Sequence, residues 1–328
     1  NDLMQIDKDE LDRFAKWVLD ISNGTVPTTV KNNESEPSWV QIPDDLLIKT
    51  DGEKIPALIN EVFPDLLNNH RNPEYLSCRA IVCPNNATVD DINSYVVNMI
   101  PGKEKEYFSC DTICKSCEHI QDYDLLYPTE FLNSINVNNF PNHRLVLKKG
   151  VTVMLLRNLN QSMGLCNGTR LLVDVLGQWV LQCTVLTGSK IGETVFIPRI
   201  ALNTTSSKWP FILQRRQFPV RVCYAMTINN SQGQTLSHVG VYLKKLLFTH
   251  GQLYVAVSRA TSRKGLKILI EDDDGNCSSE TRNVVYHEIL QAIEVTVCFI
   301  GCSSGLSLFS GHASYTFIYL CQTQEQQT

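Results

Sequence analysis

A run of small polar residues near position 230 carries groups that could hold a polar ligand. The stretch "YAMTINNSQGQTL" starts with apolar alternation and breaks into seven small polar residues, Asn229 to Thr235, one of them glycine. Side-chain amides and backbone N–H groups can grip a ligand, whereas a loop of this composition can also be surface punctuation between strands. The loop taken alone leaves both interpretations open.

A single arginine after the next apolar segment favours the ligand-binding interpretation of the loop. Arg259 follows "LYVAV" and precedes Arg263 and Lys264. A basic last turn suits the helix dipole, so the structural interpretation is an ordinary helix end. Combined with the polar loop, however, Arg259 supplies the parts needed to hold nucleic acid on one side and a phosphate on the other. The pair therefore predicts a nucleic-acid and phosphate site.

Two other groups of residues were weighed as chemical sites. The stretch "SCDTICKSCEH" contains Cys110, Cys114, Cys117 and His119, which are zinc-ligand types. Structural zinc normally joins two separated pairs, so we expect free thiols and no metal here. The phosphate-loop motif G-x-x-x-x-G-K-[ST] does not occur, since "PGKEKE" lacks both the upstream glycine and the Ser/Thr. The carboxylates of "IEDDDG" suit a solvated loop rather than a Mg²⁺ site.

The composition limits how the protein could bind nucleic acid. The 328 residues carry a net charge of −5, so nucleic-acid binding has to rest on local basic clusters. We expect such a local track from the scattered basic residues Lys148, Lys149, Arg215, Arg216, Arg221, Lys244 and Lys245. The twelve cysteines are irregularly spaced and no signal peptide opens the chain, which predicts reduced thiols in the cytosol or nucleus.

The elements that would position the loop and Arg259 follow from the hydrophobic patterns. Residues 9–21 read as a helix with Leu11, Phe14, Ala15, Val18 and Leu19 on one face. Residues 75–82 read as a buried strand, and the helix after it would begin at Thr88 as N-cap. A strand, a turn and a helix in this order predict an α/β unit.

From about residue 145 to 213 the pattern changes to five short strands separated by glycines, which is typical of a small β-barrel or sandwich. After it, "FPVRVCYAMTI" and "TLSHVGVYL" read as strands, "THGQLYVAVSRA" as a helix and "LKILIE" as a closing strand. The sequence thus predicts an α/β domain interrupted by a β-rich insertion.

The two ends of the sequence carry separate expectations. Asn1 is not an initiator Met, and we expect the chain to be a fragment of a longer protein. Residues 295–321 contain no Lys, Arg, Asp or Glu and are long enough to span a bilayer. Polar interruptions and missing basic anchors argue against a span, so we expect a disordered or non-native tail and no membrane partner.

Four segments carry a resemblance to a known family: "AMTINNSQGQTL", "HGQLYVAVSRATSRKGLKILI", "RLVLKKGVTVMLLRNLNQSMGLCNGTRL" and "RRQFPV". From about Phe14 to Ile293 the chain closely resembles the C-terminal half of Pif-type (petite integration frequency) DNA helicases. These RecD-like enzymes of superfamily one include plant and Helitron-transposon copies. The resemblance implies a motor of two RecA-like domains that moves 5′ to 3′ along single-stranded DNA while hydrolysing ATP with Mg²⁺.

The resemblance also implies a fold and its boundaries. The chain is similar to the second RecA-like (P-loop NTPase-like) α/β domain, with a small SH3-like β-barrel inserted in it. The implied division gives residues 1–144 and 220–293 to the RecA-like domain, 145–219 to the insertion and 294–328 to the tail. ATP and Mg²⁺ would be held mostly by an N-terminal RecA-like motor domain, which would be a partner absent from this chain.

Site residues are carried over from the matching motifs. The loop resembles helicase motif V, which implies that Gln232 and Gly233 couple to the nucleotide. The implied DNA-binding residues are Thr227, Asn230, Ser231 and His250. The segment "LYVAVSRA" resembles motif VI, whose arginine, here Arg259, would reach the γ-phosphate as an arginine finger. Asn230 departs from the lysine usual in the family, which would remove a phosphate-directed charge.

Two functions therefore compete. The chain is either the C-terminal part of an ATP-dependent DNA helicase, or an inactive transposon-derived remnant that at most binds single-stranded DNA. A third interpretation is a membrane-tethered fragment. The family resemblance implies DNA repair, recombination and telomere maintenance in the nucleus, with the mitochondrion as the alternative location. Without the first motor domain, we expect the chain alone to hydrolyse no ATP.

Overall fold

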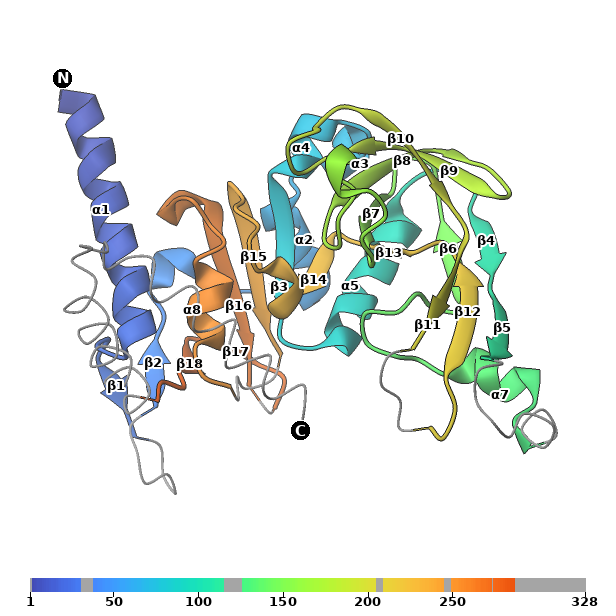
Figure 1. Cartoon of the computed structure of the whole chain (residues 1–328). Coiled ribbons are helices and arrows are strands. Elements are labelled where there is room, and N and C mark those ends of the chain that lie inside the picture. Colours follow the sequence, from blue (N-terminus) through green and yellow to red (C-terminus); the bar gives the residue numbers. More distant parts are fainter. Residues whose placement is uncertain are drawn as a thin grey trace, which may run out of the picture.

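The structure is a computed structural model that describes residues 2–30, 38–114, 126–204, 209–244, 249–272 and 274–286. Figure 1 shows an α/β part, which contains a mainly parallel sheet, beside a β-rich part. Their order along the chain is α/β, β-rich and α/β again, so the outer part is built from two separate stretches of sequence.

A five-stranded sheet forms the centre of the α/β part. Its strands, in spatial order, are β14 (Ala225–Thr227), β3 (Arg79–Cys83), β15 (His238–Leu243), β16 (Leu266–Glu271) and β17 (Cys277–Ser278). The first four strands are parallel and β17 is antiparallel to β16. Parallel pairing requires a long crossover between successive strands, and the β-rich part lies within one such crossover, between β3 and β14.

Helices cover both faces of this sheet (Figure 1). On one side, α2 (Lys54–Val62) and α5 (Asn86–Met99) pack on Ile81 and Cys83 of β3; on the other, α1 (Asp2–Asn23) and α8 (Gln252–Val257) share a core with Ala80 and Val82. Successive side chains of a strand point to opposite faces, so β3 contributes to two cores and reads as a continuous apolar run.

One glycine sets how closely α2 approaches the sheet. A Cβ at Gly240 in β15 would lie 2.4 Å from Val62 Cγ2 and 2.9 Å from Leu58 Cδ1, both on α2. No real Cβ makes such contacts, so the close packing of helix on strand depends on the absence of a side chain at this position.

The β-rich part contains three antiparallel groups of strands. The largest is a five-stranded sheet in the order β10 (Thr194–Pro198), β9 (Val180–Val185), β8 (Arg170–Leu176), β7 (Thr152–Leu155) and β13 (Val220–Val222). The others are β11 (Ile200–Asn203), β12 (Leu213–Gln217) and β5 (Cys110–Ile113), and the pair β4 (Lys105–Phe108) and β6 (Arg144–Leu147). The inner face of the large sheet joins the core of α2 and α5, so the two parts share one hydrophobic core.

The remaining elements are short. A three-stranded sheet joins β1 (Thr28–Thr29), β2 (Trp39–Gln41) and β18 (Glu280–Arg282). Three further helices are α3 (Leu66–Asn69), α4 (Pro73–Ser77) and α7 (Thr129–Ser134). Single 3-10 turns occur at η1 (Asp44–Leu46), η2 (Gln161–Met163), η3 (Asn229–Ser231) and η4 (Arg263–Gly265).

The β-rich part extends beyond residues 145–219. β4 pairs with β6 and β5 pairs with β12, although β4 and β5 precede residue 145. At the other end, "FPVRVCYAMTI" is not one strand: β13 pairs antiparallel with β7, whereas β14 pairs parallel with β3. The chain changes sheets at Cys223 and Tyr224, which are both buried. Because the apolar run is unbroken there, the sequence pattern does not reveal where one strand ends and the next begins.

Several local expectations are confirmed and others are wrong. The five strands of residues 145–213 form, and the fifth divides into β10 and β11. Tyr75 lies in α4 instead of a strand, because the Asn72 side chain caps that helix and Pro73 occupies its first position. Asn85 rather than Thr88 caps α5, its side chain accepting from the Thr88 N–H.

The first helix is confirmed, but its buried face was only partly predicted. Phe14, Val18 and Ile21 are buried, whereas Leu11 and Leu19 are 49% and 55% exposed. No helix in the described ranges is both long and apolar enough to cross a bilayer. The expected tail, residues 294–328, lies outside the described residues.

Candidate nucleic-acid interface

The polar loop begins where β14 ends. After Thr227 the chain forms η3, in which Ser231 Oγ donates to the Ile228 carbonyl at 2.7 Å and the Asn230 N–H donates to Thr227 Oγ1 at 3.3 Å. Gly233 has φ of +76° with open space where a Cβ would stand, so backbone conformation alone calls for glycine. Small polar side chains thus fold the loop by bonding to its own backbone.

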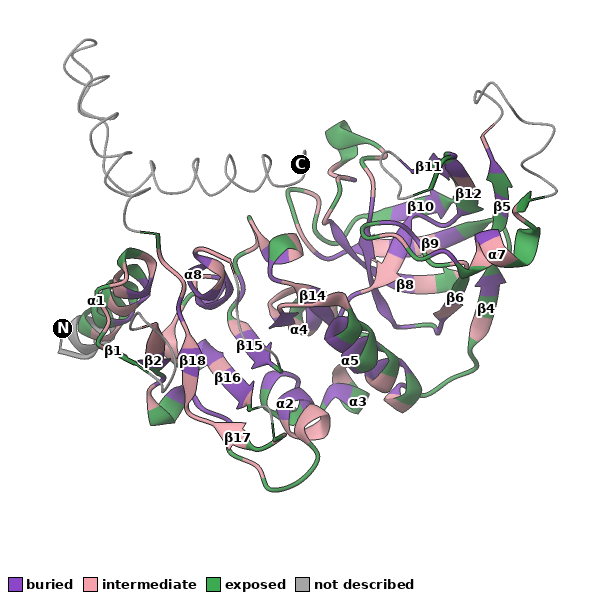
Figure 2. Ribbon diagram, turned by 90° about the horizontal axis from the view of Figure 1, so that it is seen from below, coloured by how far each residue is buried: buried purple, intermediate pink, exposed green. Residues whose placement is uncertain are grey.

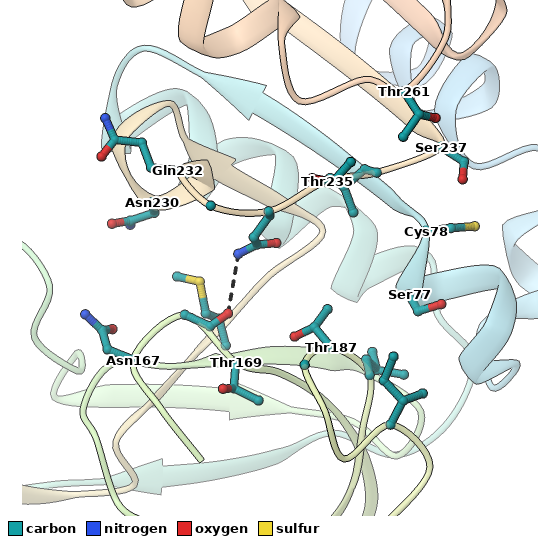
Figure 3. Close-up of a pocket in the computed structure, with 18 of the residues that line it drawn as sticks. Ser77, Cys78, Asn167, Thr169, Thr187, Asn230, Gln232, Thr235, Ser237 and Thr261 are labelled. Atoms are coloured by element: carbon teal, nitrogen blue, oxygen red, sulfur yellow. Dashed lines mark hydrogen bonds between the residues drawn. The ribbon is translucent and has the colours of Figure 1, made fainter. Parts of the chain in front are cut away.

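A cleft of about 750 Å³ lies between this loop and the β-rich part (Figure 3). The loop forms one wall through residues 229–230 and 232–237. The opposite wall contains Asn167, Gly168, Thr169, Thr187, Gly188 and Ile191. Ser77, Cys78 and Thr261 border one end. None of the described residues that line the cleft is charged, so the cleft offers amides, hydroxyls and backbone groups as its polar surface.

One side chain bridges the two walls. Gln234 Nε2 donates to the Gly168 carbonyl at 3.4 Å, the hydrogen bond drawn across the cleft in Figure 3. Gln234 Oε1 is buried, and no described residue donates to it. A buried acceptor without a partner is unfavourable, so Gln234 bridges the walls at some cost in free energy.

Arg259 lies behind the loop, immediately after α8, whose residues Leu253 to Val257 are all buried (Figure 2). Its side chain is only 5% exposed. Nη1 donates to the carbonyls of Ser231 at 3.3 Å and Gln234 at 3.2 Å, and Nε donates to the Val255 carbonyl at 2.9 Å. The guanidinium therefore ties the polar loop to the end of α8.

The structure brings some predicted site residues together and separates others. Asn230, Gln232 and Gly233 line the cleft, whereas Ser231 is fully buried beneath it. Thr227 accepts a hydrogen bond that shapes the loop, as described above. His250 is not among the lining residues: its ring stacks on Tyr286 at 5.4 Å and Nδ1 accepts the Tyr286 N–H at 3.0 Å. Its DNA-binding role stays a prediction.

Part of the wall across from the loop, residues Asn167 to Thr169, lies in a segment that matches a known protein family. Residues 130–176 match the family model described as DNA helicase Pif1, 2B domain. The ATP-dependent DNA helicase PIF1 of Homo sapiens is 39% identical over 128 residues, which are 38% of this chain and 19% of that protein. The chain therefore contains a region similar to the C-terminal part of Pif1-type helicases.

Two solved structures are also similar. The crystal structure of Pif1 helicase from Candida albicans is 25% identical with a TM-score of 0.48, over 74% of this chain and 56% of that one. Pif1 helicase from Bacteroides in complex with ADP-AlF3 and ssDNA is 20% identical with a TM-score of 0.47, over 76% and 55%. The chain spans about a fifth of the length of the first curated relatives it matches.

Within the Pif1-type region, the far wall of the cleft was missed from the sequence. Asn167, Gly168 and Thr169 lie inside the matched residues 130–176, in the quoted stretch "GLCNGT". The Asn-Gly pair predicts a turn between strands, but it does not indicate which loop that turn faces. Thr187 and Gly188 form a second such turn, and packing of the sheet places both turns opposite the loop.

Half of the described residues of the predicted basic track make structural contacts. Lys148 is 8% exposed and donates to the Ile100 carbonyl at 3.1 Å. Arg215 is fully buried, with Nη2 2.6 Å from Asp111 Oδ2, and Arg221 pairs with Asp90 at 2.6 Å. Lys149, Arg216 and Lys244 are exposed, and Lys245 lies outside the described residues. The prediction of a basic track is wrong for the three paired side chains.

The cysteines give no metal site in the described part. Cys110 is exposed with a free thiol and Cys114 is half-buried, while Cys117 and His119 lie outside the described residues. Within the described ranges no three His, Cys, Asp or Glu side chains are placed to hold a metal ion. Cys78 at the cleft is also a free thiol, and Arg79 Nη1 lies 3.0 Å from its Sγ.

A histidine next to Ser237 of the cleft wall is held neutral. Burial, followed by the charge of Arg79, lowers the pKa of His238 below its usual value. At neutral pH this imidazole therefore adds no positive charge beside the cleft, consistent with the uncharged lining.

Proposed function

We propose that this region is the C-terminal part of an ATP-dependent 5′ to 3′ DNA helicase and that single-stranded DNA binds in the cleft between the polar loop and the β-rich part. The observation that supports this most is the cleft itself, about 750 Å³ and lined by amides and hydroxyls from both parts. The name of the human relative, an ATP-dependent DNA helicase, points to the same activity.

The uncharged lining specifies how DNA would be held. Salt dependence of DNA binding reflects the number of phosphates neutralised by Lys and Arg. A cleft without charged lining residues makes its contacts through hydrogen bonds to sugars, base edges and phosphate oxygens instead. We therefore propose a shallow salt dependence for the part of the binding that the cleft contributes.

ATP and Mg²⁺ belong to the proposed activity, but the described residues do not fit them. The cleft offers neither a cation for a triphosphate nor a carboxylate for Mg²⁺, and the 328 residues lack the phosphate-loop motif. A companion RecA-like motor domain would hold the nucleotide. The arginine-finger role of Arg259 stays part of the proposal, although its guanidinium is directed at loop carbonyls. A nuclear location is likewise a prediction.

Two substitutions of opposite charge test the site. Asn167→Asp places a carboxylate on one wall and should weaken binding of a fluorescent oligothymidine about tenfold at low salt through repulsion of phosphates. Asn230→Lys on the other wall should strengthen it and steepen the logarithmic salt dependence by about one. Fluorescence anisotropy at several salt concentrations measures both effects.

The matched control for Asn167→Asp is Asn203→Asp, which adds the same charge at an exposed residue of β11 that does not line the cleft. It should change affinity less than twofold, as expected of a remote screened charge. Equal effects of the two Asp variants would exclude the cleft as the binding site. The absence of any binding to single-stranded DNA would exclude the proposed function.

A further inference from the structure

The hydrogen bonds of Arg259 form part of a continuous chain across the molecule. Its Nη1 holds the Ser231 and Gln234 carbonyls, and the Gln234 side chain continues to the Gly168 carbonyl on the opposite wall. Residues distant in the sequence are thereby linked: the end of α8, the polar loop and a turn of the β-rich part. The same turn carries Asn167, which lines the cleft.

The two carbonyls that meet at Nη1 lie on either side of two cleft-lining residues of the loop. Gln232 and Gly233 lie between Ser231 and Gln234, and both line the cleft. A guanidinium that binds the carbonyls on either side of this pair fixes the turn between them. Backbone bonds reinforce the attachment, since the Leu236 N–H donates to the Arg259 carbonyl at 2.9 Å and the Thr261 N–H donates to the Leu236 carbonyl at 3.0 Å.

The donor geometry makes Arg259 suited to this task. A guanidinium presents several N–H donors in a rigid plane, so one side chain can hold several acceptors in a fixed arrangement. Nη2 donates to Ser258 Oγ at 2.9 Å and Nε to the Val255 carbonyl, which leaves Nη1 directed at the loop. At 5% exposure these bonds are shielded from competing water.

We propose that Arg259 is a positioning residue for the cleft, because it holds the Ser231–Gln234 turn in the conformation that binds single-stranded nucleic acid. The Gln234 side chain then joins this turn to the opposite wall through its hydrogen bond to Gly168. The inference rests on the proposed function of the cleft. The positioning role differs from that of an arginine finger, because Arg259 acts on the loop without nucleotide and contacts no phosphate.

The distinguishing experiment measures oligothymidine binding to the 328-residue chain in the absence of nucleotide. Arg259→Ala should weaken binding about tenfold, because the loop then has to be ordered during binding. Arg259→Lys should recover part of the loss, since an ammonium can still bond one carbonyl. Arg263→Ala is the matched control: it removes a guanidinium four residues away that pairs with Asp45 and should leave affinity unchanged.

A second readout does not depend on DNA. Amide hydrogen exchange of residues 231–234 should quicken in Arg259→Ala, while exchange in the central strands β3 and β15 stays at its parental rate. If the parental chain binds no DNA but this local effect is seen, the positioning role stands and the proposed function fails. If nucleotide-free affinity and loop exchange both match those of the parent, the positioning role is overturned.

The link through Gln234 is tested by a double-mutant cycle. Gln234→Ala alone should weaken DNA binding less than Arg259→Ala does, because it removes one end of the chain of bonds. If the two residues act through the same turn, the double variant loses less affinity than the product of the single losses, by more than about twofold. Independent losses would show that Arg259 does not act through Gln234.

Discussion

Two buried arginines, Arg215 in the β-rich part and Arg259 beside the cleft, use the same group in different ways. Arg215 is fully buried and bonds both oxygens of Asp111 and the carbonyls of Pro141 and Leu132. Arg259 bonds the carbonyls of Ser231 and Gln234, both in the loop that lines the cleft, together with the Val255 carbonyl and the Ser258 hydroxyl.

The difference separates a structural ion pair from a group that can act on a binding site. The Arg215 guanidinium is matched by a full opposite charge and joins β12 to β5 within one sheet. Two acceptors of Arg259 are backbone carbonyls of the loop that lines the cleft. Bonds from a guanidinium to carbonyls are weaker than a bidentate ion pair. Releasing the loop from Arg259 should therefore cost less free energy than breaking the Arg215–Asp111 pair.

The largest expected effect comes from breaking the Arg215 pair. Asp111→Ala should lower the free energy of unfolding by about 3–5 kcal/mol, because it leaves an unpaired charge in the core. Urea denaturation followed by circular dichroism measures the loss. Glu106→Ala, which removes the exposed partner of Arg144, is the control and should lower the free energy of unfolding much less, because water screens an exposed pair. Equal losses would mean that burial of the pair does not matter.

Arg259→Ala should have an intermediate effect on stability. It removes buried bonds to neutral acceptors, which we expect to cost about 1–3 kcal/mol in free energy of unfolding. The same urea titration measures it beside Asp111→Ala. A loss as large as that of Asp111→Ala would contradict the contrast between the two arginines and make Arg259 chiefly a core residue.

The smallest expected loss in free energy of unfolding comes from the exposed ion pair between Arg263 and Asp45. Arg263 donates to Asp45 at 2.7 Å, and this hydrogen bond lowers the pKa of the Asp45 carboxyl below its ordinary 3.8. Both side chains are partly exposed, so Arg263→Ala should cost under about 1 kcal/mol at neutral pH.

The pH dependence of that pair has a defined sign. Because the folded-state pKa of Asp45 is the lower one, its contribution is present above the unfolded-state pKa and is lost as pH falls through the folded value. The stability difference between Arg263→Ala and the parent should therefore shrink as the pH is lowered to about 3. A difference that persists in acid would rule out the carboxylate as its source.

The local elements of the fold were largely predictable because their signals are local. Short runs of strand-forming residues separated by glycines indicate β8 and β9, and the apolar face of residues 9–21 indicates α1. The expectation failed where a short-range cap outweighed the apolar pattern, as at Asn72 ahead of Tyr75. It also failed at Cys223, where one apolar run serves two sheets, because a hydrophobic pattern does not specify which sheet buries it.

Only one wall of the candidate site, the polar loop, was predictable from the sequence. The motif resemblance directed attention to Asn230, Gln232 and Gly233, and all three line the cleft. Gly168 could not be assigned in the same way, because its distance to Gln234 depends on how the β-rich part packs against the loop. Arg215 was taken for a surface cation for the same reason: its partner Asp111 is distant in the sequence.

The motif resemblance was enough to indicate the Pif1-type region, and residue types with short-range periodicity indicated its polar loop and the arginine after the following helix. The acceptors of that arginine, the uncharged cleft and the bridge from Gln234 to Gly168 were decided only by the tertiary structure. The physical reason is that strand and helix signals arise between residues a few positions apart. Hydrogen-bond partners of buried charges are instead set by the packing of elements far apart in the sequence.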